Sequence, residues 1–67
     1  MKISSITGLS AILEFDHQEL LAINNSLNEV CNGIDLQGEF ETRIGTTREE
    51  AQDLLKALNS LISELKH

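Results

Sequence analysis

The stretch TREEAQDLLKALNSLISELK, residues 47–66, decides the architecture, because its apolar residues recur at the spacing of one helix face. At 100° per residue, seven of them fall within a stripe about 120° wide. They are Ala51, Leu54, Leu55, Leu58, Leu61, Ile62 and Leu65. Thr46 or Thr47 can cap the helix, each with a glutamate three residues later. The stretch therefore predicts a helix over about residues 47–66.

A second helix is predicted upstream, over about residues 17–32. Asp16 and Glu19 have the spacing of a capping box, in which each residue bonds the backbone N–H of the other. Apolar residues then follow on one stripe: Leu20, Ile23, Leu27, Val30 and Cys31. Gly33 is suited to the position after the last helical residue, so the helix is expected to end there.

The N-terminal residues have a strand pattern. Leu9, Ala11, Leu13 and Phe15 alternate with Ser10, Ile12 and Glu14, and Ile3 and Ile6 lie among serine and threonine residues. Thr7-Gly8 is suited to a tight turn, since glycine tolerates a positive φ. These features predict a hairpin with strands over about residues 2–7 and 9–15. A two-stranded hairpin is only marginally stable alone, so it is expected to lie on the helices.

Residues 34–45 allow two interpretations. Apolar and β-tolerant residues occupy even positions, as in a strand: Ile34, Leu36, Phe40, Thr42 and Ile44. The alternative is a short helix from about Glu39 to Ile44 that ends at Gly45. The helix is favoured, because it gives Gly45 a structural role. Phe40 and Ile44 are expected to point into the core in either case.

Together these elements predict one small α+β domain spanning residues 1–67. An N-terminal β-hairpin would pack on two antiparallel α-helices, with the short element between them. Chains of this length bury only about 60% of their unfolded surface, so they often add a disulfide, a metal or a partner subunit.

The composition excludes several functions. Eleven acidic residues against five basic ones give a net charge of −6, which disfavours nucleic acid and anionic membranes as partners. No stretch reaches the roughly 20 apolar residues that a membrane helix needs. Cys31 is the single cysteine, so no internal disulfide can form, and a reducing, cytoplasmic location is expected.

No motif for catalysis, cofactor binding or metal binding is present, so we expect no enzyme activity, no cofactor and no metal site. His17 and Cys31 are the residues that most invite such a role. They are fourteen residues apart, which is about 21 Å along a continuous helix. Cys31 is therefore expected to be a small core residue and His17 to be exposed.

A candidate interaction surface combines amides on the first helix with two arginines. Its members are Leu21, Asn24, Asn25, Asn28, Arg43 and Arg48. The alternative is that the amides bond nearby backbone or face water, and that Arg43 forms a local ion pair. Arg48 lies in the first turn of its helix, where a positive charge opposes the helix dipole unless a partner offsets it.

Two neighbouring stretches resemble a pattern in small bacterial proteins of no known activity. The first is NNSLNEVCNGI, residues 24–34, and the second is FETRIGTTREEA, residues 40–51. The resemblance covers about residues 15–60. It implies a bacterial origin and nothing about mechanism.

The leading functional hypothesis is a non-enzymatic protein–protein interaction module, such as an adaptor, an inhibitor or immunity-type protein, or a small regulatory subunit. The apolar stripe of the second helix is longer than one helix and two short strands can cover. A homodimer is therefore expected through Leu54, Leu58, Leu61 and Leu65, with the first strand as a further contributor, and an unknown protein partner is a further expectation. The alternative is an acidic DNA mimic or anti-defence protein that binds a nucleic-acid-binding protein.

Overall fold

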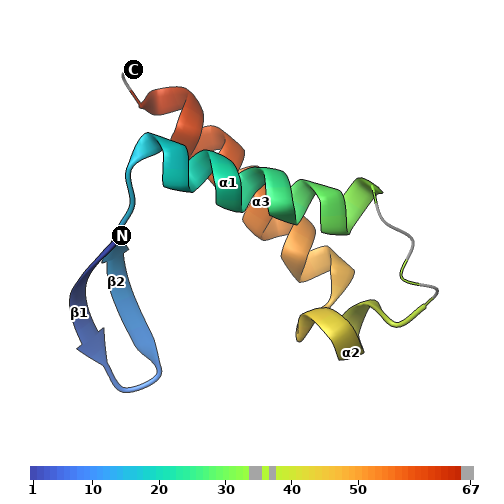
Figure 1. Cartoon of the computed structure of the whole chain (residues 1–67). Coiled ribbons are helices and arrows are strands. Elements are labelled where there is room, and N and C mark those ends of the chain that lie inside the picture. Colours follow the sequence, from blue (N-terminus) through green and yellow to red (C-terminus); the bar gives the residue numbers. More distant parts are fainter. Residues whose placement is uncertain (34–35, 37, 66–67) are drawn as a thin grey trace.

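The structure is a computed structural model that describes residues 1–33, 36 and 38–65. Two strands come first, β1 (Lys2–Thr7) and β2 (Ser10–Glu14), and helices follow (Figure 1). These are α1 (His17–Asn28), the π-helical turn η1 (Glu29–Gly33), α2 (Phe40–Ile44) and α3 (Arg48–Glu64). The predicted fold class, a small α+β domain with an N-terminal hairpin and an antiparallel helix pair, is confirmed.

Helix α1 begins with the predicted capping box. The Glu19 backbone N–H donates to Asp16 Oδ1 at 2.8 Å, and the Asp16 N–H donates to Glu19 Oε1 at 3.0 Å. The chain remains helical up to Gly33, but its last five residues, Glu29–Gly33, form the wider π-helical turn η1. The sequence predicts the length of this helical segment and not its change of winding.

Helix α3 is capped by Thr47, one of the two predicted candidates. The Thr47 hydroxyl oxygen accepts a hydrogen bond from the Glu50 backbone N–H at 3.0 Å. The helix extends to Glu64, and the predicted last residue, Lys66, lies outside the described residues.

The segment before α3 contains the predicted short helix, α2. Gly45 follows it with φ +92°, a left-handed conformation that costs glycine little and other residues more. Ile34, which belonged to the strand interpretation, lies outside the described residues. Phe40 is buried as expected, but the prediction for Ile44 is wrong, since its side chain is 36% exposed. Only one turn of helix is present, and it buries the residue at its start.

The core lies where α1 and η1 meet α3. Its buried members are Cys31, Leu36, Phe40, Ala51 and Leu55, with Leu27 and Val30 packed against them. The two long helices run in opposite directions and contact each other along this core (Figure 1). A single pair of helices forms one layer, so each can bury only the side that faces the other.

The hairpin is formed as predicted, but it does not lie on the helices. It extends from the start of α1 away from the helix pair (Figure 1), and every residue of β2 is exposed. The radius of gyration is 13.4 Å, whereas a compact chain of this length has about 11 Å. The expected packing is therefore wrong, because only a short connection joins the hairpin to α1 and directs it outward.

Candidate functional site

A β-bulge gives the hairpin one apolar side. Ile3 pairs with Leu13 and Ile6 pairs with Ala11, but the register shifts by one residue between Ile3 and Ser5. In a regular strand, residues three apart point to opposite sides. The extra residue at the bulge instead places both isoleucines on the side of Leu13 and Ala11. We call these four residues the apolar hairpin face.

The apolar hairpin face is uncovered in the chain. Ile3 is 56% exposed and Ile6 69% exposed, and Leu13 is also exposed. The other side of the hairpin is mostly polar, with the pairs Lys2–Glu14, Ser5–Ile12 and Thr7–Ser10. One side of this small sheet is thus suited to an apolar contact and the other largely to water.

A second uncovered apolar surface lies on the helix pair. On α1, Ile23 lies roughly 60° around the helix axis from the buried residue Leu20. On α3, Leu54 lies at about the same angle from the buried residue Ala51, in the same sense of rotation. Leu61 lies two turns after Leu54. The two helices are antiparallel (Figure 1), so this rotation leads to the same side of the pair. We call Ile23, Leu54 and Leu61 the apolar helix face; all three are exposed.

The residues predicted to form the dimer contact divide into two groups. Leu54 and Leu61 are 55% and 43% exposed. Leu58 and Leu65 are half-buried. The exposed pair is therefore the part of this stripe that a partner can still cover.

The predicted amide surface lies on α1, on the side opposite the apolar helix face. Asn25 and Asn28 are exposed, and Asn28 Oδ1 accepts a hydrogen bond from the Asn32 side chain at 3.0 Å. Leu21 and Asn24 are half-buried. The Oδ1 atom of Asn24 is buried and has no hydrogen-bond partner among the described residues. The amides therefore do not share one environment.

The two predicted arginines have different surroundings. Arg43 is an exposed residue of α2. Arg48 instead donates from Nη1 to the Cys31 carbonyl oxygen at 2.6 Å, and its guanidinium carbon lies 4.6 Å from the centre of the Phe40 ring. The carbonyl end of a helical segment thus provides the partner that offsets the unfavourable position of Arg48 at the start of α3. Its guanidinium contributes to holding the fold together.

His17 and Cys31 lie at opposite ends of the segment 17–33. Cys31 is buried in the core, as predicted, while His17 is half-buried rather than exposed. Across the described ranges 1–33, 36 and 38–65, no group of three or more His, Cys, Asp or Glu side chains could hold a metal ion.

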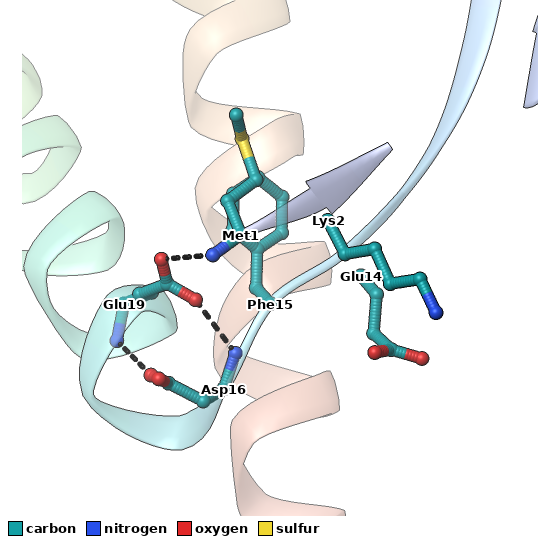
Figure 2. A pocket seen from close by; sticks show the side chains of 6 residues that line it. All are labelled: Met1, Lys2, Glu14, Phe15, Asp16 and Glu19. Carbon is teal, nitrogen blue, oxygen red and sulfur yellow. Dashed lines mark hydrogen bonds and ion pairs between the residues drawn. The ribbon is translucent and has the colours of Figure 1, made fainter. Parts of the chain in front are cut away.

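An open cleft of 380 Å³ lies where the hairpin joins α1 (Figure 2). Six residues line it: Met1, Lys2, Glu14, Phe15, Asp16 and Glu19. Glu19 is central, because one carboxylate oxygen accepts from the Met1 amine at 2.5 Å and the other from the Asp16 N–H at 3.0 Å. The carboxylate thereby connects both ends of the hairpin to the first turn of α1.

The charges at this cleft stabilise each other. The hydrogen bond to Glu19 raises the pKa of the Met1 amine above its usual value of 8.0, and the nearby carboxylates of Asp16 and Glu14 act in the same direction. The hydrogen bond from the amine, followed by that from the Asp16 N–H, lowers the pKa of Glu19 below 4.5. Both oxygens of the Glu19 carboxylate thus accept hydrogen bonds. We call this connection between the hairpin and α1 the joint.

Sequence reasoning identified Leu54 and Leu61 but missed the apolar hairpin face. Ile3 and Ile6 are three residues apart, which hides their common side unless the bulge is known.

Among the described residues, no helix has both the length and the apolar character required to cross a membrane. The chain matches no family model, no curated protein and no solved structure.

Proposed function

We propose that this chain is a non-enzymatic protein–protein interaction module that acts as a homodimer in the cytoplasm. The main support for the proposal is the amount of solvent-accessible surface that the chain leaves uncovered. The chain exposes 5314 Å², about 1,100 Å² more than a compact monomer of its mass. A stable interface buries about 800 Å² on each partner.

The uncovered surface is also apolar where a dimer needs it. Leu54 and Leu61 on α3 are large aliphatic side chains in contact with water, and Ile23 lies on the same side of the helix pair. Exposed apolar side chains gathered on one side of a molecule are typical of protein interfaces. The single helix layer supports the same proposal, since a second layer would cover its open side.

The cytoplasmic location is supported by the one cysteine. Cys31 is a free thiol buried in the core. A small domain stabilised by a partner subunit rather than by disulfides is typical of reducing compartments.

Sedimentation equilibrium over a range of concentrations tests the dimer. The wild-type chain is expected to be dimeric, and Leu61→Lys is expected to raise the dimer Kd by about 100-fold, since a symmetric interface carries the change twice. Ser60→Lys adds the same charge at an exposed neighbouring residue of α3 and is expected to remain dimeric. A wild-type monomer at high micromolar concentration would contradict the proposal.

A further inference from the structure

The apolar hairpin face is the largest uncovered feature that the helix-based dimer leaves unexplained. It is one-sided, because the bulge collects Ile3, Ile6, Ala11 and Leu13 on a single face. A two-stranded hairpin has little stability of its own, and the described helices do not cover this one. A hairpin with this composition needs a surface to pack against.

We propose that the apolar hairpin face of each chain packs on the apolar helix face of a second copy, so that two copies exchange hairpins in a twofold-symmetric dimer. The inference rests on the proposed homodimer and specifies which surfaces form it. Each copy contributes one hairpin and one helix surface, and the closed twofold arrangement covers both surfaces in both copies.

The shape of the chain supports an exchange between copies. The hairpin projects from the start of α1 and lies beyond the edge of its own helix pair (Figure 1). The molecule measures 36 × 32 × 16 Å, so it is broad and thin rather than spherical. A projecting hairpin can reach a neighbouring chain without any change in its own connection to α1.

The distribution of charge favours hairpin-to-helix contact over helix-to-helix contact. Residues 2–14 contain one lysine and one glutamate, so the whole formal charge of −6 lies in residues 15–67. Placing two helix pairs against each other would bring together two strongly acidic bodies. An apolar hairpin with no net charge covers the same helix surface without that repulsion.

Two other ways of bringing two copies together would cover less apolar surface. Contact between the two hairpins alone would leave Leu54 and Leu61 in water, and contact between the two helix pairs alone would leave Ile3 and Ile6 in water. The excess of about 1,100 Å² over a compact monomer exceeds the 800 Å² or so that one partner buries in a standard interface. Exchange of hairpins uses both surfaces and fits this area best.

The hairpin offers a matched pair of substitutions for the test. Ile6→Lys places a charge on the apolar hairpin face, whereas Ile12→Lys places the same charge on the opposite side of the same hairpin. Ile6→Lys is expected to raise the dimer Kd by about 100-fold in sedimentation equilibrium, since the change is carried twice. Ile12→Lys is expected to change it less than about threefold. Equal effects of the two substitutions would overturn the inference.

The same measurement separates this inference from the proposed function. If Leu61→Lys gives monomers and Ile6→Lys remains dimeric, the dimer stands and the exchange of hairpins is wrong. If the wild-type chain is monomeric, both proposals fail. If Ile6→Lys and Leu61→Lys are each monomeric, the result supports the homodimer and the exchange of hairpins.

Cross-linking then identifies which surfaces meet. Ile6→Cys and Leu61→Cys are made separately in a Cys31→Ala background, checked for helix content by circular dichroism, mixed, and treated with a short bismaleimide. The inference expects the product that joins residue 6 of one chain to residue 61 of the other. Products joining only 6 to 6 or 61 to 61, or no product in a sample shown to be dimeric, would overturn it.

Discussion

The Arg48 guanidinium donates to the Cys31 carbonyl oxygen at 2.6 Å and so ties the first turn of α3 to the turn η1 that follows α1. The same guanidinium lies over the Phe40 ring of α2 at 4.6 Å. One side chain of α3 thus contacts both η1 and α2. A charged hydrogen bond to a carbonyl at a helical terminus is stronger than a neutral one.

Replacing Arg48 by alanine is expected to lower the free energy of unfolding by about 2 kcal/mol, because it removes a charge-assisted hydrogen bond and a cation–π contact. Urea denaturation followed by circular dichroism measures the change. Arg43→Ala is the matched control, since Arg43 is exposed on α2, and its effect is expected to stay within about 0.5 kcal/mol. Equal losses for the two variants would show that the contacts of Arg48 contribute no stability.

Glu19→Gln is expected to destabilise the joint between hairpin and helix most strongly near neutral pH. The lowered pKa of Glu19 means that its contribution is present above pH 4.5 and is lost as the pH falls through its folded-state pKa. The raised pKa of the Met1 amine means that its contribution is present below pH 8.0 and is lost as the pH rises through its folded-state pKa. Urea midpoints of the wild-type chain and of Glu19→Gln, measured across this pH range, give the difference in stability. A difference that does not change with pH would contradict these contributions of Glu19 and the Met1 amine.

Gly45→Ala is expected to lower the free energy of unfolding by about 1 kcal/mol, because an alanine is strained at φ +92°. No atom within 4 Å would meet an added Cβ, so the cost comes from the backbone conformation and not from a collision. Gly45→Asn is expected to cost less, since asparagine tolerates left-handed conformations better. Thermal unfolding compares the variants, and an alanine variant as stable as the wild-type chain would disprove this explanation.

Asn24→Leu is expected to raise the free energy of unfolding by about 1 kcal/mol, because it replaces a buried carbonyl oxygen that has no partner among the described residues. Asn25→Leu is the control, since Asn25 is exposed on the same helix and gains little from an apolar side chain. Chemical denaturation below the dimer Kd distinguishes the two. A loss of stability in Asn24→Leu would indicate that this amide has a polar partner.

Much of the fold could be predicted from local signals in the sequence. The Asp16–Glu19 capping box and the Thr47 cap are hydrogen bonds between residues three apart, so the sequence alone specifies where α1 and α3 begin. Gly45 likewise marks the end of α2 through its own backbone preference. These features need no knowledge of tertiary contacts.

The features that could not be predicted depend on contacts between distant segments or on register. The hairpin meets α1 at Glu19, where residues 18 apart in sequence are in contact. The role of Arg48 depends on Cys31, which is 17 residues away. The common side of Ile3 and Ile6 depends on a single unpaired residue in β1. Periodicity describes which residues prefer burial, but it does not say which neighbour covers them.

The bulge in β1 means that the common side of Ile3 and Ile6 depends on Ser4 staying out of the ladder. Removing Ser4 would leave Ile3 and Ile6 two residues apart in a regular ladder with the same partners, so both would stay on the same side of the hairpin. A serine-to-threonine exchange at the same position would leave the two sides as they are. If Ser4 instead joined the ladder, Ile6 would pair with Ser10 and turn to the polar side, so association through the apolar hairpin face would be lost with every residue of the strand still present.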